Sequence, residues 1–562
     1  MARRGRSEAR GALHSQQASE APWCSVEESR VLLGRNAMTD QVPCPAAPAS
    51  PMAGERASTL RNVLSNWSGL GVNALLSLLM TPILVHGLGG LYFGMYMLVA
   101  SILDSCGLLD FGMRTAMFRF LARYRGSGER EELDRTFASG VMIAFCSAGL
   151  ILLAATVAEF LLPRFFVVAA ADRPVFRALI LLLGGSVAAA FLSQILGTYL
   201  FAFRRFDFYN LNSALTGIVR AVLIVVALHL RGGVLAVAAI TLGCSLLSLF
   251  TSSQLVRIAD PALAFSLRGV SRGRIRELLG FSGNAFLGTL GDQMRFFIDS
   301  VVIGRVLGIA SITPFVIPGR LMVLFRELGF SLASPLAGVM SEIAGRRDED
   351  ALRASFLRAT RLCLLLSLFV SLLLLVNGSW LIRFWVGPGY ASSYPLMLVM
   401  LSGYFLMLAQ QPSVDLFLAQ GRHRLRGWWN LGEGAANLAL SIYWGRRYGL
   451  VGIALGTAAP MIFVQLFIQP WYALRTIALP AARYFREALL RPALVAAIVL
   501  GVCGVLHPWQ HSYSAGWLLL SVGWQAALYL GLAWKLALTA GEREQFASRG
   551  RNALGAARPP SS

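Results

Sequence analysis

Charged residues inside apolar stretches are the first candidates for function in this chain. The stretch 281–304 carries Asp292, Arg295 and Asp299. Their i, i+3, i+7 spacing places all three on one face of a helix. A charge at the centre of a bilayer costs at least about 2.5 kcal/mol unless it faces a partner or a water-filled cavity. These residues therefore predict either an ion pair that holds helices together or a path for a charged substrate.

Two further arginines lie deep in apolar stretches. Arg220 lies mid-way along 211–230 and has no acidic residue within one helical turn, and Arg320 lies two turns from Glu327, too far for a local pair. A guanidinium is never neutral in a protein, so each needs water, a partner helix or an anion. We predict that Arg220, Arg295 and Arg320 line a cationic cleft that binds a pyrophosphate or an acidic glycan bidentately.

Four acidic residues are candidates for binding a coupling ion or for pairing with these arginines: Asp104, Asp110, Asp292 and Asp299. Asp110 can also pair with Arg114 at i, i+4.

Other charged residues have a simpler interpretation. Arg114, Arg119 and Asp415 fit loop edges from which side chains reach the headgroups. Glu433 fits a helix start, where the dipole favours a negative charge. The seven cysteines form no CxxC pair and no disulfide framework, so we predict no metal site, no cofactor and no catalytic group.

The elements that position these residues are long apolar stretches separated by short loops. The chain is 56% hydrophobic and 14% charged, with a mean hydropathy of +0.61. A helix needs about 20 mostly apolar residues to cross a bilayer. About fourteen stretches meet this requirement: 62–86, 92–113, 137–162, 175–202, 211–230, 234–256, 281–304, 312–340, 360–382, 394–418, 428–445, 450–474, 489–506 and 514–536.

The arginines predict the orientation of the chain in the membrane. They crowd into every second loop, which gives one arginine-rich side: 114–135, 204–205, 257–276, 346–361, 422–426 and 475–491. Positively charged loops stay in the cytoplasm, so we expect both termini to be cytoplasmic. The net charge of +21 then reflects membrane topology, and we expect no nucleic-acid partner.

Residues 1–57 are rich in Arg, Ser, Ala and Pro and are expected to be a disordered leader. A short basic segment after Met52 runs directly into the first span, which favours Met52 or Met38 as the working start. Residues 539–562 are expected to be a disordered tail.

An internal repeat predicts the domain organisation. At an offset of 219 residues, Leu88 meets Leu307, Leu109 meets Leu328 and Phe111 meets Phe330. Cytoplasmic amphipathic stretches also join the second and third spans of each half. An offset of six spans preserves orientation, so the halves are parallel repeats. We therefore expect an all-α protein of two six-helix bundles and two extra C-terminal helices. Its parts are 58–257, a linker 258–280, 281–475 and 476–538.

Two similar bundles enclose a cleft that rocking can expose to each membrane face in turn, which is typical of transporters. The external loops are short, about a dozen residues at most. Because membrane enzymes usually need a longer polar segment for their chemistry, we expect no enzymatic activity.

The segments "YFGMY" (92–96), "LLDFGM" (108–113) and "ARYRGSGEREEL" (122–133) are similar to the second-span region of bacterial polysaccharide-biosynthesis flippases. These belong to the multidrug, oligosaccharidyl-lipid and polysaccharide (MOP) exporter superfamily. The resemblance runs over about residues 58–536. It implies ion-coupled flipping of an undecaprenyl-pyrophosphate-linked oligosaccharide through a cationic cavity. No local motif transfers the family's cavity arginines to this chain, so Arg220, Arg295 and Arg320 rest on their depth alone.

Alternatives remain open at this point. They are a cation-coupled drug exporter of the same superfamily, a peptidoglycan-precursor flippase, a membrane glycosyltransferase or polymerase, and a non-catalytic scaffold. Asp104 and Asp110 keep the exporter open, while the basic central spans favour the flippase. The expected location is the bacterial inner membrane. The expected partners are lipid-linked oligosaccharide, membrane lipids and other polysaccharide-assembly proteins.

Overall fold

The computed structural model describes residues 53–110, 112–263, 269–280, 290, 298–421, 423–506, 515–544 and 548, with side chains outside 53–70, 108–110, 332, 334, 335 and 423–425. Each secondary-structure element of this described part is a helix, and eleven segments are long and apolar enough to cross a membrane. The prediction of an all-α, multi-pass membrane protein is confirmed. The orientation of the termini stays a prediction. Residues 61–562 form one compact unit.

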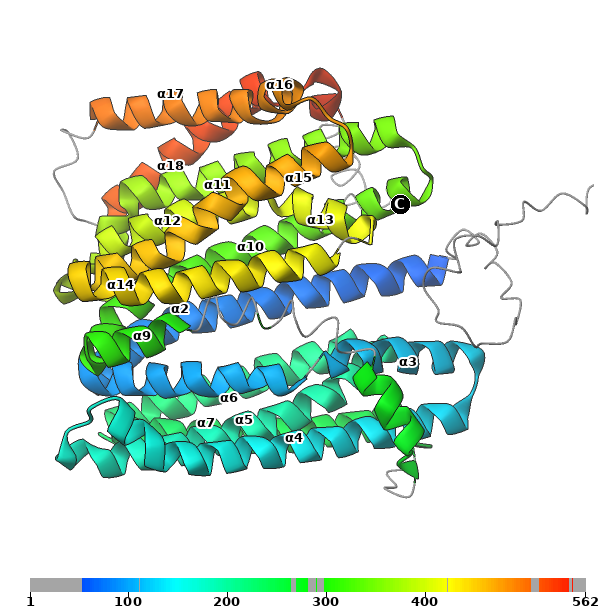
Figure 1. Ribbon diagram of the computed structural model, residues 1–562, viewed down its shortest axis with the longest axis vertical. Helices are drawn as coiled ribbons and strands as arrows, with labels where there is room; N and C mark the ends of the chain where they lie inside the picture. The colour runs from blue at the N-terminus through cyan, green and yellow to red at the C-terminus, as the bar shows by residue number, and fades with distance from the viewer. Residues whose placement is uncertain are drawn as a thin grey trace, which may run out of the picture. The chain divides into compact units, whose positions relative to one another are not determined.

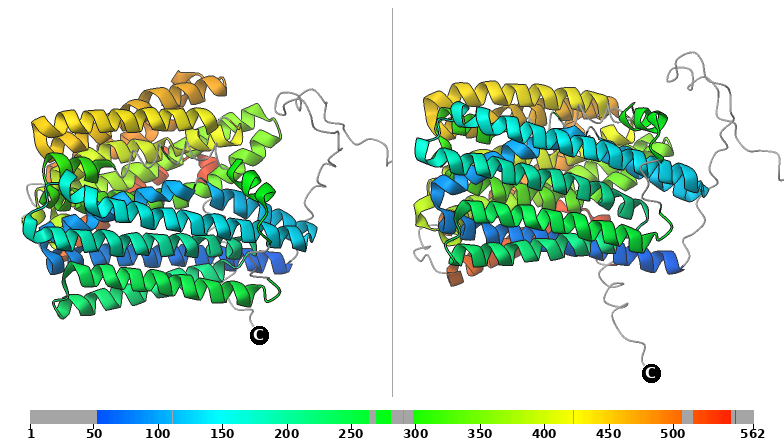
Figure 2. Two further views of the ribbon diagram at one scale, coloured as in Figure 1. Left: turned by 60° about the horizontal axis from the view of Figure 1, so that its bottom comes forward. Right: turned by 90° about the horizontal axis from the view of Figure 1, so that it is seen from below.

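The N-terminal half contains the helices that build most of the site. Their bounds are α2 (Ala53–Asp104), the 3₁₀ helix η2 (Ser105–Asp110), α3 (Met113–Ser127), α4 (Arg130–Phe165), α5 (Arg173–Ala202), α6 (Phe206–His229) and α7 (Gly233–Ala259). Helix α5 packs against α4 and α7, and α6 packs against α7 (Figure 1). Figure 2 shows these cyan-to-green helices running alongside one another. Buried Phe137, Tyr199 and Val256 are part of a core that joins α4, α5 and α7.

The C-terminal half contains the helices that face the site from the other side. Their bounds are α9 (Ile298–Val306), α10 (Ile312–Gly345), α11 (Glu349–Trp385), α12 (Ser393–Ala409), α13 (Gln411–Ala419), α14 (His423–Phe463), the π-helix η7 (Val464–Ile468) and α15 (Gln469–Thr476). Helix α10 contacts α11, α12 and α13, and α14 contacts α9 and α12. The expected stretch 281–304 is described only at residue 290 and from residue 298 onward.

Two of the eleven segments each contain a sharp turn at a glycine. Gly89 has φ 76° and Gly449 has φ 63°, values that residues with a Cβ atom rarely adopt. Around Gly449 the chain reverses so tightly that a Cβ placed on Gly456 would clash with the Ser441 Oγ. Each segment therefore holds two apolar stretches, as the sequence predicts for 62–86 with 92–113 and for 428–445 with 450–474.

One predicted continuous span, 394–418, is divided in the structure. Helix α12 ends at Ala409 and α13 begins at Gln411. Pro412 lies at the start of α13 and has no backbone N–H to donate to the preceding turn. The break places polar side chains of Gln410 and Ser413 inside the half, where the Ser413 hydroxyl donates to the Gln410 side chain at 3.0 Å.

The two C-terminal helices, α17 (Leu490–Leu506) and α18 (Ala515–Leu532), pack on α11. The Asn377 amide donates to the Gln525 Oε1 at 3.0 Å, and the Ser521 hydroxyl donates to the Asn377 Oδ1 at 2.7 Å. Such bonds between helices are the usual polar contacts inside membrane bundles, where water is absent. They attach the extra helices to the C-terminal half.

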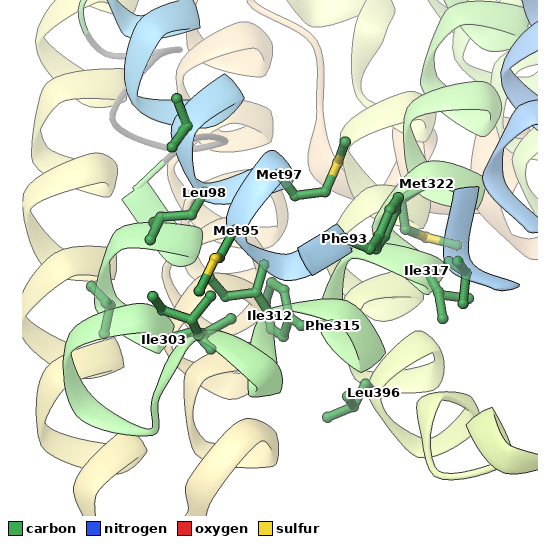
Figure 3. Close-up of a cluster of buried hydrophobic side chains, with 14 of the residues drawn as sticks. Phe93, Met95, Met97, Leu98, Ile303, Ile312, Phe315, Ile317, Met322 and Leu396 are labelled. Carbon is green, nitrogen blue, oxygen red and sulfur yellow. The ribbon is translucent and has the colours of Figure 1, made fainter. Parts of the chain in front are cut away.

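A cluster of buried side chains joins the two halves at one end. Figure 3 shows Met95 of α2 lying against Ile312 and Phe315 of α10, Phe93 beside Met322 and Ile317, and Leu98 on the side of Ile303; all belong to one buried cluster. The cluster lies beside the turns at Gly89 and Gly308, which is the arginine-poor end of the helices. We call this cluster, with Ile303, the seal.

Polar contacts accompany the seal. The Thr313 hydroxyl donates to the Gly90 carbonyl at 2.6 Å, and the Ser101 hydroxyl donates to the Ser300 hydroxyl at 3.2 Å. A Cβ placed on Gly94 would lie 2.5 Å from the Ile309 carbonyl oxygen, so the backbones of the two halves touch there. The halves are thus closed against each other at the arginine-poor end.

Candidate functional site

A cavity of about 390 Å³ lies among α2, α5, α6 and α7, and α10 of the C-terminal half contributes one residue to its wall. We call it the central cavity. Its polar lining residues are Asn73, Ser77, Thr81, Tyr96, Asp104, Ser186, Arg220, Thr241, Ser245 and Arg320. Two arginines and one aspartate are the charged side chains among these described residues, so the net charge of the lining is positive.

Arg320 is the residue that the C-terminal half adds to this cavity. Its Nη2 atom donates to the sulfur of Met97 at 3.2 Å. The guanidinium also interacts electrostatically with the carboxylate of Asp104, which lines the same space. Four of its five N–H donors have no protein acceptor in the described part of the chain, so they can bind an anion.

Arg220 reaches the same cavity from α6. Its side chain is exposed and makes no hydrogen bond or ion pair to another described residue. The sequence shows no acidic residue within one turn, and folding does not bring one within ion-pair distance among the described positions. A charged arginine without an ion-pair partner inside a helix bundle costs free energy unless water or an anion occupies the cavity.

A second space, which we call the side chamber, adjoins the central cavity. It has a volume of about 200 Å³ and lies among α2, α5, α6 and α7. The two share Asn73, Gly217, Arg220 and Ser245 as wall residues. Arg220 therefore stands at the junction of the two spaces.

The remaining predicted site residues differ in where they lie. Asp104 lines the central cavity, while Asp299 is buried elsewhere, between α9 and α14. Asp292, Arg295 and the side chain of Asp110 lie outside the described residues. Three predicted residues, Arg220, Arg320 and Asp104, therefore share one site.

Asp299 belongs to a cluster of oxygen atoms in the C-terminal half. The Thr457 hydroxyl donates to the Asp299 Oδ2 at 2.8 Å and lies 3.3 Å from the Asn437 Oδ1. The Ser441 hydroxyl donates to the Asn437 Oδ1 at 2.7 Å, and the Ile453 carbonyl lies 3.3 Å from the Ser441 hydroxyl. The turn at Gly449 brings these residues together, because it folds the second half of α14 back on the first.

Two acidic residues are more buried than the sequence suggested. Asp415, which fitted a loop edge, is 5% exposed, and Glu433, which fitted a helix start, is 2% exposed. The Asp415 Oδ1 accepts a bond from the Gln411 amide at 3.0 Å. The loop-edge interpretation of Asp415 is wrong because the helix break at Gln410 turns this residue inward. Pro412 was the sequence signal that could have indicated it.

The described part of the chain contains no group of three or more His, Cys, Asp or Glu side chains that could hold a metal ion.

Comparison with known proteins agrees with the resemblance that the sequence indicates. Residues 59–317 match the family described as polysaccharide biosynthesis protein, and residues 285–426 match the MatE family. Together the matches run through both halves. They confirm the similarity of the chain to polysaccharide biosynthesis flippases of the MOP superfamily and its character as a multi-pass membrane protein.

Individual similar proteins agree with these matches. The chain is 23% identical to the uncharacterized membrane protein EpsK of Bacillus subtilis, over 88% of this chain and 98% of EpsK. It is 19% identical to a protein provisionally named an O-antigen transporter in Shigella flexneri, over 74% of this chain and 98% of that protein. The structure of the lipid II flippase MurJ, in an inward closed conformation, superposes with a TM-score of 0.64 at 16% identity, over 84% and 98%. At that identity the last comparison shows a shared fold.

Proposed function

We propose that this protein moves a lipid-linked oligosaccharide across the inner membrane, and that the central cavity binds its pyrophosphate. The observation that carries the proposal is the meeting of Arg220 and Arg320 in one cavity, one arginine from each half. A pyrophosphate has oxygen atoms that two guanidinium groups can bind bidentately, which an uncharged or cationic drug cannot offer. Binding between the halves also lets the substrate move when one half rocks against the other.

The position of the seal supports entry of the substrate from the cytoplasmic side. It closes the arginine-poor end, and loops poor in arginine face away from the cytoplasm under the positive-inside rule. In this state the cavity therefore accepts the substrate from the cytoplasmic leaflet. Opening of the seal would release the substrate to the other leaflet.

Asp299 is the candidate for coupling to an ion gradient. The Thr457 hydroxyl bonds its carboxylate, and the Asn437 amide, Ser441 hydroxyl and Ile453 carbonyl oxygens belong to the same hydrogen-bonded cluster. Such oxygens are the ligands of hard cations. The same carboxylate could carry a proton instead. Because α9 and α14 both contribute, occupancy of this cluster would change the packing of the C-terminal half.

Proteoliposomes with the full-length protein test the proposal. Fluorescent undecaprenyl pyrophosphate bearing one sugar is placed in one leaflet, and its arrival in the other is followed by quenching. We expect Arg220→Ala and Arg320→Ala each to slow flipping at least about tenfold, since a hydrogen bond to a charged group is worth about 1.5–3 kcal/mol. Arg164→Ala is the matched control, because Arg164 is exposed at the end of α4 outside the cavity. Unchanged flipping in both cavity variants would contradict the proposal.

A cation-coupled drug exporter is the second candidate, and the match of residues 285–426 to the MatE family favours it. In that case the proteoliposomes would transport a cationic dye such as ethidium. Arg320→Ala would then leave dye transport unchanged or raise it, because the arginine repels a cation. Transport of the dye without the lipid would replace the first proposal with the second.

A further inference from the structure

The side chamber has a lining that differs from that of the central cavity. Apart from Arg220, its polar residues are hydroxyl and amide side chains: Asn73, Ser193, Gln194, Tyr209, Asn212, Ser213, Thr216, Ser245, Ser248 and Ser252. Arg220 is the charged residue among its described lining positions and stands at the wall shared with the central cavity. The chamber thus continues the anion site into a neutral, hydrogen-bonding space.

Part of this polar surface serves helix packing. The Asn212 amide donates to the Ser252 hydroxyl at 2.9 Å, and the Ser193 and Ser252 hydroxyls lie 3.0 Å apart. These bonds connect α5, α6 and α7, as hydroxyl and amide groups commonly do between membrane helices. They account for Ser193, Asn212 and Ser252 without a ligand.

Other polar groups of the lining are not used in packing. Within the described part of the chain, neither the Tyr209 nor the Ser213 hydroxyl makes a hydrogen bond. Gln194 is exposed and uses its Oε1 to accept a bond from Arg114, which leaves the two N–H donors of its amide. Hydroxyls and amides that both donate and accept match the hydroxyls of a sugar.

The Tyr209 ring is held in a fixed place. It packs edge-on against Phe201, with ring centroids 4.6 Å apart. A Cβ placed on Gly197 would lie 2.7 Å from the Tyr209 Cε2, so only glycine leaves room for the ring there. A rigid aromatic face beside hydroxyl groups is suited to a ring that is apolar on its faces and polar at its edge.

We infer that the side chamber binds the first sugar of the lipid-linked substrate, while Arg220 and Arg320 bind the pyrophosphate. This inference rests on the proposed function and adds the sugar site to it. The order of the groups follows from the substrate's own connectivity, because the sugar is bonded to the pyrophosphate and Arg220 joins the two spaces. The chamber has no carboxylate among its described lining residues, so it does not select a cationic group.

The test compares two probes on the purified full-length protein in nanodiscs. One is undecaprenyl pyrophosphate, and the other is the same lipid bearing one N-acetylglucosamine, galactose or glucose. We expect the wild-type protein to bind one of the sugar-bearing lipids more tightly than the bare lipid. We expect Tyr209→Leu and Ser213→Ala to weaken binding of that lipid about threefold to tenfold and to leave the bare lipid unchanged.

Two further variants probe the geometry. Gly197→Ala keeps every polar group but pushes the Tyr209 ring aside, so we expect the same selective loss as in Tyr209→Leu. Tyr443→Leu and Ser253→Ala are the matched controls: Tyr443 is an exposed side chain on α14, the Ser253 hydroxyl bonds the Phe250 carbonyl of its own helix, and neither lines the two cavities. We expect both controls to bind both probes as the wild type does.

The outcomes separate this inference from the proposed function. Equal wild-type affinity for the bare and all sugar-bearing lipids overturns the sugar site and leaves the pyrophosphate site intact. Equal loss of both probes in Tyr209→Leu and Gly197→Ala also overturns it, since the chamber would then serve only packing. If the wild type binds none of the lipids, the proposed function fails, and the sugar site fails with it.

Discussion

The Arg320 guanidinium of the C-terminal half donates a hydrogen bond to the Met97 sulfur of the N-terminal half at 3.2 Å. A thioether is a weak acceptor, so this contact holds the side chain in place without satisfying its charge. Asp104 interacts with the same guanidinium and lines the same cavity. Any movement that separates the halves must break the contact with Met97. Because Arg320 contacts both halves, binding of an anion to it would change the interaction between them.

The planar guanidinium of Arg320 predicts that the shape of this side chain, as well as its charge, contributes to flipping. Arg320→Lys keeps the positive charge but loses the planar fork that binds two oxygens at once. We expect flipping of the pyrophosphate lipid to fall about threefold to tenfold, less than in Arg320→Ala. Met97→Leu, which removes only the sulfur, should stay within about twofold of the wild type. Flipping rates in proteoliposomes measure all three. Equal rates for Arg320→Lys and the wild type would show that charge alone matters.

The closeness of the two backbones at Gly94 predicts a variant that opens the seal. Gly94→Val adds carbon atoms where even a Cβ would lie only 2.5 Å from the Ile309 carbonyl oxygen, so the seal must widen. We expect a cysteine placed at Phe315 to react at least about tenfold faster with a membrane-impermeant maleimide added from the arginine-poor side. The background should be a chain in which all seven native cysteines are replaced by alanine or serine.

Gly149→Ala is the control for this experiment, because a Cβ at Gly149 meets no atom within 4 Å. It should leave the labelling rate at the level of the parent. No acceleration in Gly94→Val would mean that the seal adapts to the added side chain without opening.

The sequence predicted the positions of the helices along the chain better than it predicted which side chains of each helix face the interior. Apolar length alone was enough for the spans, and Gly89 and Gly449 lie in the expected turns. Arg220 and Arg320 were identified because they lie deep inside apolar stretches, and the hydropathy of the sequence is enough to locate such stretches. That they meet was not predictable, because contact depends on how far each helix is rotated about its axis and on how α6 and α10 pack.

The same limit explains what the sequence missed. Asp415 and Glu433 lie near the ends of apolar stretches, where a charge usually reaches water, but both are buried. Their burial follows from the break between α12 and α13 and from packing against neighbouring helices. The side chamber also gave no signal, because serine and asparagine are common between membrane helices whether or not they line a space.

The oxygen cluster around Asp299 predicts ion dependence of transport. Asp299→Asn keeps the size of the side chain and its ability to accept from Thr457 but removes the negative charge. We expect flipping to lose its acceleration by an imposed Na⁺ gradient or by an imposed pH gradient, whichever drives the wild type. Running the two gradients separately in proteoliposomes tells a sodium site from a proton site.

Asp172→Asn serves as the control for Asp299→Asn, since Asp172 accepts a bond from Tyr92 at 3.0 Å outside this cluster. It should keep the response of the wild type. If Asp299→Asn responds to both gradients as the wild type does, coupling occurs elsewhere.

The bonds made by Asp260, just beyond the end of α7, predict that the stability of the folded protein depends on pH. Its carboxylate accepts hydrogen bonds from Arg130 at 2.5 Å and from the Tyr199 hydroxyl at 2.5 Å, which ties the start of the linker between the halves to α4 and α5. Burial alone would raise the pKa of Asp260, but the bonds from Arg130 and Tyr199 and the charge of Arg130 outweigh it and lower the pKa. A lowered pKa stabilises the fold above the ordinary value of about 3.9 and loses this contribution as the pH falls through the folded value.

We therefore expect Asp260→Asn to be less stable than the wild type at pH 7 by about 1–2 kcal/mol, a modest value because Arg130 is 40% exposed and solvent screens the pair. Thermal unfolding in detergent should show a loss of roughly 1–3 °C at pH 7, shrinking below about pH 4 as the wild-type carboxylate gains its proton. Asp350→Asn should show no such loss, because its carboxylate is 93% exposed. A difference between Asp260→Asn and the wild type that stays constant from pH 7 to pH 3 would contradict the assignment, since only the ionised carboxylate accepts both bonds with full strength.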